Sequence, residues 1–90
     1  MQKVILDGRN MTDKAATQEY LKEQFRFPEY YGRNLDALYD CLTEIEVETE
    51  IQIEHKKQIA EYLGDYVEAL VDTIRDAAQE NPNLQLTESE

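Results

Sequence analysis

The spacing of apolar and polar residues divides the chain into short strands and amphipathic helices. Val4-Ile5-Leu6 is an apolar run closed by Gly8, which is typical of a strand buried on both faces. Ile51-Gln52-Ile53 is a second strand-like segment, and a connection of alternating glutamates precedes it. We therefore expect three strands, at residues 3–7, 51–53 and 84–86.

Four helices are predicted between these strands. Thr12 or Asp13 can cap the first helix, and Pro28 ends it because proline disfavours helical geometry at the residue before it. Asn34 is the expected cap of the second helix, and Gly64 is the expected left-handed cap of the third. The expected spans, in chain order, are residues 13–25, 34–43, 56–63 and 65–80.

The order strand, helix, helix, strand, helix, helix, strand predicts an α/β fold. Strands joined by helical crossovers form a parallel sheet covered by helices. A chain of 90 residues is long enough for one core without metal or disulfide, since it buries roughly 60–70% of its unfolded surface. We expect a single domain over residues 1–90, with residues 87–90 frayed.

The charge balance excludes several classes of partner. Twenty acidic residues against nine basic ones give a net charge of −11, which disfavours direct binding to nucleic acid or to an anionic membrane. A basic protein partner fits this charge, although acidity can also serve solubility alone. One cysteine, no leader-like start and no long apolar run predict a soluble cytoplasmic protein.

The helix expected at 34–43 has two unlike faces. One face is apolar and carries Leu35, Leu38 and Leu42. The opposite face is polar and carries Asp36, Asp40 and Thr43, and Tyr39 lies between the two faces. Like charges four residues apart repel by a few tenths of a kcal/mol, so either neutral drift or a cationic partner would explain this pair. Tyr30 and Tyr31 lie just before the helix, and tyrosine is enriched at interface hot spots.

The last helix carries a second acidic row, formed by Asp72, Asp76 and Glu80. This acidic row lies opposite the apolar stripe of the same helix. The alternative interpretation for Asp72 is therefore that it belongs only to the solvated face of an amphipathic helix.

No residue pattern indicates catalysis or metal binding. Two aspartates on one exposed helix face lack the desolvated pocket that acid–base catalysis needs. His55 has no nucleophile at a recognisable spacing, and Cys41 reads as a structural thiol without basic neighbours. The sequence contains no EF-hand, P-loop or His/Cys ligand spacing. We therefore expect a non-enzymatic protein without cofactor or metal.

The segment Pro28-Glu29-Tyr30-Tyr31-Gly32-x-Asn34-Leu35-Asp36-Ala37-Leu38-x-Asp40-Cys41-Leu42 resembles, nearly residue for residue, the corresponding segment of the barstar family. These proteins are intracellular inhibitors of barnase-type bacterial ribonucleases. The resemblance extends more loosely over the whole chain, including Ile74-Arg75-Asp76-Ala77. It implies a small three-stranded parallel sheet packed with about four helices.

The resemblance also implies how the chain acts. The helix at 34–43 and its preceding loop would plug the cationic cleft that binds RNA phosphates, with Asp36 and Asp40 paired to active-site Arg and Lys. Tyr30 would pack near the catalytic histidine, and Asp76 and Glu80 would be rim contacts. The residues expected to touch the partner are Tyr30, Asn34, Asp36, Tyr39, Asp40, Thr43, Asp76 and Glu80.

Three positions depart from the family pattern. Arg33 stands where the family carries an acid, and a cation there should weaken attraction to a basic cleft locally. Glu44 and Ile45 stand where the best-known member has glycine and a contacting tryptophan. These departures concern which nuclease is bound.

The leading hypothesis is an inhibitor or immunity protein that blocks a basic bacterial ribonuclease by phosphate mimicry. The competing hypothesis is an adaptor or regulatory module that has kept the fold without binding a nuclease. An acidic enzyme or divalent-ion binder is a third class, which calorimetry with Ca²⁺ or Mg²⁺ would test.

Overall fold

The computed structural model describes residues 1–89. Its strands are β1 (Gln2–Asp7), β2 (Thr49–Glu54) and β3 (Leu84–Glu88). Its helices are α1 (Lys14–Phe25), α2 (Leu35–Thr43), α3 (Lys56–Leu63) and α4 (Tyr66–Glu80), with a 3₁₀ turn at Gly8–Asn10. The element order matches the expectation from sequence. None of the described helices has the length and apolar character needed to cross a bilayer.

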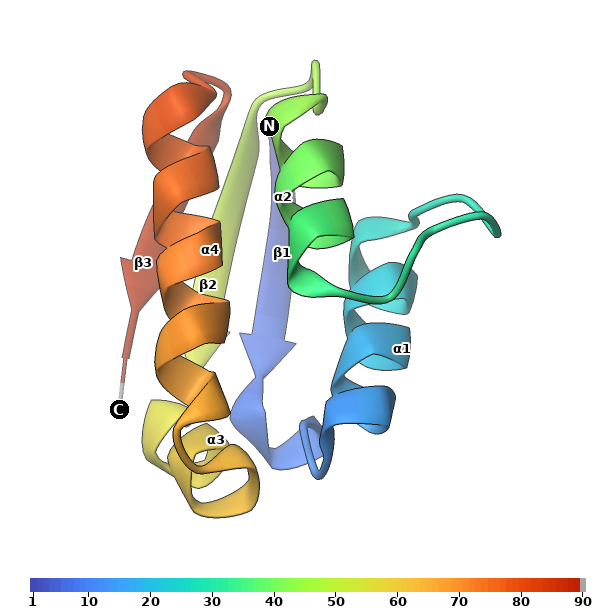
Figure 1. Cartoon of the computed structure of the whole chain (residues 1–90). Helices are drawn as coiled ribbons and strands as arrows, with labels where there is room; N and C mark the ends of the chain where they lie inside the picture. Colours follow the sequence, from blue (N-terminus) through green and yellow to red (C-terminus); the bar gives the residue numbers. More distant parts are fainter. Residues whose placement is uncertain (90) are drawn as a thin grey trace.

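The three strands form one parallel sheet in the order β1-β2-β3. Val4 is in register with Ile51, and Ile51 with Leu86. Helices α1, α2 and α4 run antiparallel to the strands, and α2 lies between the other two (Figure 1). The α/β architecture predicted from the sequence, a small parallel sheet with four helices, is therefore confirmed.

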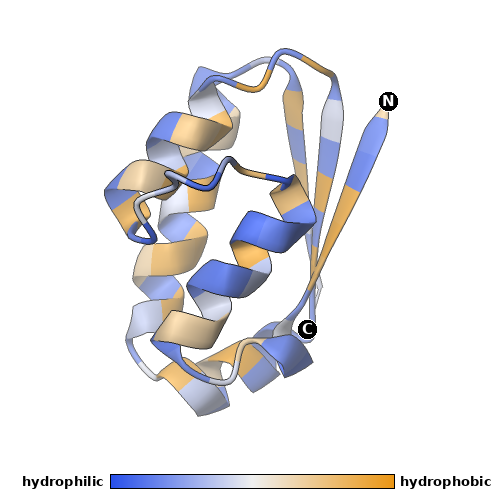
Figure 2. Cartoon of the chain, turned by 90° about the vertical axis from the view of Figure 1, so that its right-hand side faces the viewer, coloured by the Kyte–Doolittle hydropathy of each residue, from blue (hydrophilic) through white to orange (hydrophobic). Residues whose placement is uncertain are grey.

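The helices cover only one face of the sheet, as the side view shows (Figure 2). In β1, Val4 and Leu6 are buried, but Ile5 between them is 40% exposed. In β2, Ile51 and Ile53 are buried and alternate with partly exposed polar residues. The prediction that the first strand is buried on both faces was wrong, because three successive apolar residues do not reveal whether both faces are covered.

Side-chain caps fix the starts of α1 and α2. The Asp13 carboxylate accepts from the Ala16 N–H at 2.7 Å, and the Asn34 side chain accepts from the Ala37 N–H at 2.7 Å. Both caps were expected. Gly64 follows α3 with a positive φ of 58°, but its ψ of −133° lies outside the left-handed helical region that we had expected.

The third strand continues further than the sequence suggested. Thr87 and Glu88 belong to β3, and the Ser89 N–H donates to the Ile53 carbonyl at 2.8 Å. The expected fraying from Thr87 onward is therefore not seen up to Ser89, because backbone pairing with β2 holds these residues. Glu90, also within the expected frayed segment, lies outside the described residues.

Glu88 joins the end of β3 to two helices. Its carboxylate accepts two hydrogen bonds from Arg75 at 2.7 Å and one from Lys56 at 3.1 Å. Hydrogen bonding to Arg75, with a further contribution from Lys56, lowers the pKa of Glu88 to about 2. The charged carboxylate therefore stabilises the folded state.

Asn81 ties the end of α4 to the end of α2. Its buried amide N–H₂ donates to the Leu42 carbonyl at 3.0 Å and to the Ile45 carbonyl at 2.9 Å, with a longer contact to Thr43 at 3.4 Å. Its side-chain oxygen accepts from the Asn83 N–H. Carbonyls at a helix end have no partner within the helix, so one side chain satisfies the end of α2 from a neighbouring element.

We predict that Glu88→Gln reduces stability in a pH-dependent way. A carboxyl whose folded pKa is lowered contributes stability above its unfolded pKa, and this contribution is lost as the pH falls from about 4.5 towards about 2. The free energy of unfolding of the wild type should exceed that of the variant by about 1–2 kcal/mol near neutral pH. The two values should be equal in strong acid. Urea unfolding across pH measures this difference, and the exposed Glu23→Gln serves as control. A stability difference that does not change with pH would contradict the assignment of this stabilisation to the charged Glu88 carboxylate.

We also predict that Asn81→Asp destabilises the fold by about 3 kcal/mol or more, because a buried carboxylate would face carbonyl oxygens and could not donate. The exposed Asn10→Asp is the matched control and should change stability by no more than about 0.5 kcal/mol. Thermal and urea unfolding measure both effects. Equal stability of the two variants would show that the Asn81 contacts contribute little.

Candidate functional site

The loop at residues 26–34 leaves α1 and presents one tyrosine to solvent. Arg26 caps α1 in the left-handed region, with a φ of 58°. Its backbone N–H donates to the Glu23 and Lys22 carbonyls in the last turn of the helix. The Phe27 ring then lies between two others: it stacks on Phe25 at a centroid distance of 5.1 Å and is tilted by 39° against Tyr31 at 4.8 Å. Because these rings hold the loop from within, Tyr30 projects outward with 88% of its surface exposed.

A buried polar chain holds the other end of this loop. The Tyr31 hydroxyl donates to the Gln18 side-chain oxygen, and the Gln18 amide donates to the Tyr66 hydroxyl at 3.0 Å. Tyr31 is 2% exposed and Gln18 is 3% exposed. Burial raises the pKa of Tyr31, so its hydroxyl stays protonated and remains a donor. The loop is thereby connected to both α1 and the start of α4.

Helix α2 is held by its apolar face, as its sequence predicted. Leu38 and Leu42 are fully buried, whereas Leu35 is only half-buried. Asp36 and Asp40 are both exposed on the outer side. Among the described residues, no lysine or arginine forms an ion pair with either carboxylate. The helix therefore offers two unneutralised carboxylates from a fixed backbone.

Two of the cations that precede α2, Arg33 and Lys22, are engaged elsewhere. Arg33 forms an ion pair with Glu19 of α1 and donates to the Tyr31 carbonyl at 3.0 Å. Lys22 pairs with Glu29 at 3.0 Å. The pair with Glu19 raises the pKa of the Arg33 guanidinium. Arg33, expected from the sequence to weaken the field around α2, therefore has its charge largely offset by Glu19.

The other residues expected to contact a partner fall into two groups. Asn34, Tyr39 and Thr43 belong to α2 or its cap: Asn34 is exposed, and the other two are half-buried. Asp76 and Glu80 are exposed on α4, the helix that packs beside α2. The Asn34 side chain accepts a hydrogen bond as the helix cap and also donates from its N–H₂ to the Gly32 carbonyl at 3.2 Å, so one of its two N–H groups remains for a partner.

A groove beside α2 was not predicted from the sequence. It has a volume of about 450 Å³ and is walled by the loop on one side and the outer flank of α2 on the other. Tyr30 and Asp40 both line it, so the structure brings these two expected contacts to one place. The only signal for this groove in the sequence was a cluster of aromatic residues: Phe25, Phe27, Tyr30 and Tyr31. Their closeness to Cys41 and Ile45 depends on how the loop folds back, which the sequence does not show.

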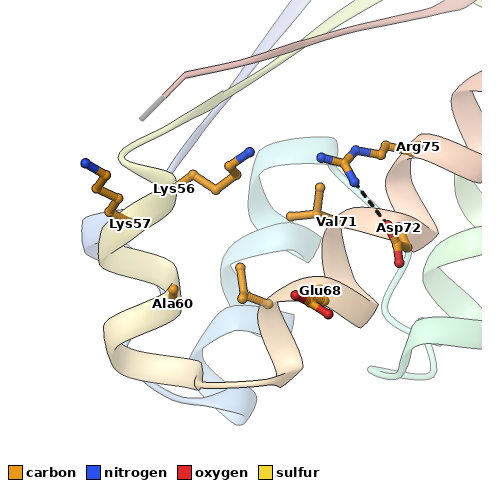
Figure 3. Close-up of a pocket in the computed structure, with 8 residues that line it drawn as sticks. Lys56, Lys57, Ala60, Glu68, Val71, Asp72 and Arg75 are labelled. Carbon is orange, nitrogen blue, oxygen red and sulfur yellow. Dashed lines mark hydrogen bonds and ion pairs between the residues drawn. The ribbon is translucent and has the colours of Figure 1, made fainter.

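A second hollow, of about 460 Å³, lies between α3 and α4 (Figure 3). It contains none of the residues expected to bind a partner. Its arginine, Arg75, is paired with Asp72 at 3.1 Å and with Glu88, and Lys56 also pairs with Glu88. The charges of Lys56, Arg75, Asp72 and Glu88 therefore offset one another within the protein. Lys57 and Glu68 also line this hollow.

The remaining candidates for chemistry are His55 and Cys41. His55 is exposed before α3, with φ 56°. Cys41 is half-buried, and burial raises the pKa of its thiol, so the nucleophilic thiolate is disfavoured. Within residues 1–89, no three His, Cys, Asp or Glu side chains are grouped so as to hold a metal ion.

Comparison with known proteins assigns the family. The family model described as "Barstar (barnase inhibitor)" matches residues 1–87. A protein of Bacillus subtilis (strain 168) named "Putative ribonuclease inhibitor YrdF" is 36% identical over 81 residues, which cover 89% of this chain and 89% of that protein. The parallel sheet with four helices agrees with both matches. The chain belongs to the barstar family of ribonuclease inhibitors.

Proposed function

We propose that this protein inhibits a basic bacterial ribonuclease of the barnase type by inserting α2 into its active-site cleft. Asp36 and Asp40 take the place of RNA phosphates and pair with cationic side chains there. The proposal rests above all on one observation: both carboxylates are exposed, and within residues 1–89 neither forms an ion pair, on a helix that is fixed at both ends. The protein itself performs no reaction, and it acts in the cytoplasm as an immunity protein.

Rigidity favours this role. Association costs free energy whenever side chains and loops must be ordered, so a preformed binding surface binds more tightly than a flexible one. Here Asn34 caps the start of α2, Asn81 satisfies its end, and Leu38 and Leu42 fix its inner face. Two carboxylates held at a constant separation can accept charge-assisted hydrogen bonds from guanidinium and ammonium groups.

The overall field supports the same partner. A net charge of −11 attracts a basic protein over several ångströms and speeds its encounter, by an amount that falls with ionic strength. Arg33 opposes this attraction less than its position suggests, because Glu19 pairs with it. Tyr30 adds exposed aromatic surface next to Asp40, which is the composition of an interface hot spot.

We predict that Asp40→Ala weakens inhibition of barnase by more than about thirtyfold, since it leaves cations of the partner buried without a counter-charge. Large losses on truncating an interface aspartate are known for the barnase–barstar pair itself, so this size follows from analogy. The measurement is the inhibition constant for cleavage of a fluorogenic RNA, at two salt concentrations.

Asp72→Ala is the matched control, because it also removes one exposed helical aspartate and one unit of charge. Asp72 is paired with Arg75 on α4, so its loss should change inhibition by less than about threefold. Similar effects of the two variants on the inhibition constant would refute the assignment of α2 as the surface that binds the ribonuclease. Absence of inhibition by the wild type would favour an adaptor module that has kept the fold.

A further inference from the structure

Tyr31 closes the turn that carries Tyr30. The Tyr31 N–H donates to the Pro28 carbonyl at 2.9 Å, so Glu29 and Tyr30 are the central residues of a β-turn. Tyr31 is 2% exposed, whereas Tyr30 is 88% exposed. The direction in which Tyr30 projects into solvent therefore depends on how firmly the core holds Tyr31.

Two kinds of contact attach this loop to α1. Glu29 and Arg33 form ion pairs with α1, and both of these loop side chains are exposed. Exposed ion pairs contribute little to stability, and salt weakens them. The bond from the Tyr31 hydroxyl to the Gln18 side-chain oxygen is buried instead, so neither water nor salt competes with it. This buried bond is the main attachment of the turn.

Tyr66 completes the hydrogen bonding of Gln18. The Gln18 amide nitrogen donates to the Tyr66 hydroxyl at 3.0 Å, which directs the amide oxygen at Tyr31. Gln18 is 3% exposed, and a buried N–H₂ group without a partner costs free energy. The Nζ of Lys14 lies 4.9 Å from the centre of the Tyr66 ring and favours this ring position. A residue at the start of α4 thus orients the amide on α1 that binds the loop (Figure 1).

We propose that Gln18 and Tyr66 are positioning residues of the ribonuclease-binding surface, which keep Tyr31 in place and so fix the direction of Tyr30. The inference rests on the proposed function. Gln18 is buried and acts only through Tyr31. A loop that is ordered before association loses less conformational entropy when the complex forms. Breaking this chain of hydrogen bonds therefore shortens the lifetime of the complex more than it slows the encounter, which charge governs.

Tyr66→Phe tests the inference, because it keeps the ring and removes only the hydroxyl that Gln18 bonds. With barnase as the probe, this change should raise the inhibition constant about three- to tenfold, mainly through faster dissociation. Tyr62→Phe removes a hydroxyl from a tyrosine that is 45% exposed and is the matched control. It should change the inhibition constant by less than about twofold.

A double-mutant cycle with Tyr30→Ala distinguishes positioning from a general loss of stability. In the Tyr30→Ala background there is no ring to place, so Tyr66→Phe should then cost less than about twofold. In the Asp40→Ala background Tyr66→Phe should keep its full effect, because Asp40 belongs to α2 and not to the loop. An equal loss in the wild-type and Tyr30→Ala backgrounds would overturn the positioning role.

Hydrogen exchange of the free protein gives a measurement that needs no nuclease. Tyr66→Phe should speed exchange of the Tyr31 N–H by at least about fivefold, because the turn opens more often. Exchange of the Ala37 N–H, which the Asn34 cap holds at 2.7 Å, should stay unchanged. Gln18→Met, which removes both bonds and keeps the length of the side chain, should speed exchange at Tyr31 further. Unchanged exchange at Tyr31 in both variants would contradict the inference.

The results separate this inference from the proposed function. If Asp40→Ala weakens inhibition of barnase but Tyr66→Phe does not, the positioning role is overturned and the acidic helix still carries binding. If the wild type does not inhibit barnase, the proposed function fails, whereas exchange at Tyr31 still decides whether Gln18 and Tyr66 hold the loop.

Discussion

The anchoring of α2 is the constraint on which the rest of the molecule depends. This helix has only nine residues, and an isolated helix of that length is marginal in water. It persists because Leu38 and Leu42 are buried beneath it and because polar groups from elsewhere satisfy its ends. Bonds to the Leu42 and Thr43 carbonyls at its C-terminal end come from Asn81, which lies almost forty residues later in the chain. The acidic face is therefore a product of the whole core.

The placement of cations is the second theme of the structure. Residues 34–55 contain no lysine or arginine, so the acidic helix and the connection after it have no counter-charge of their own. Arg33, just before this stretch, pairs with Glu19, and Arg75 pairs with Asp72 and Glu88 between α4 and β3. The uncompensated negative charge is thus left where the proposed cationic cleft would meet it.

Charge and shape have separate roles in this arrangement. A negative field acts on any basic protein and decreases with salt, so it brings partners together but discriminates poorly among them. The groove beside Asp40 is a feature of shape, lined by the loop at residues 26–34 and by α2. The buried Tyr31 and Gln18 hold this loop against α1. The loop therefore fixes the shape beside α2, whereas the exposed carboxylates belong to α2 itself.

The sequence alone determined the elements and the identity of the acidic face, because caps and helical periodicity are local properties of the backbone. Asn34 as a cap, and Leu38 opposite Asp36 and Asp40, needed no tertiary information. Tertiary structure decided what depends on distant neighbours: the open face at Ile5, the pairing that extends β3, the partner of Arg33, and the groove at Ile45. A residue's spacing predicts which way it faces within its own element, but not what the rest of the chain places against it.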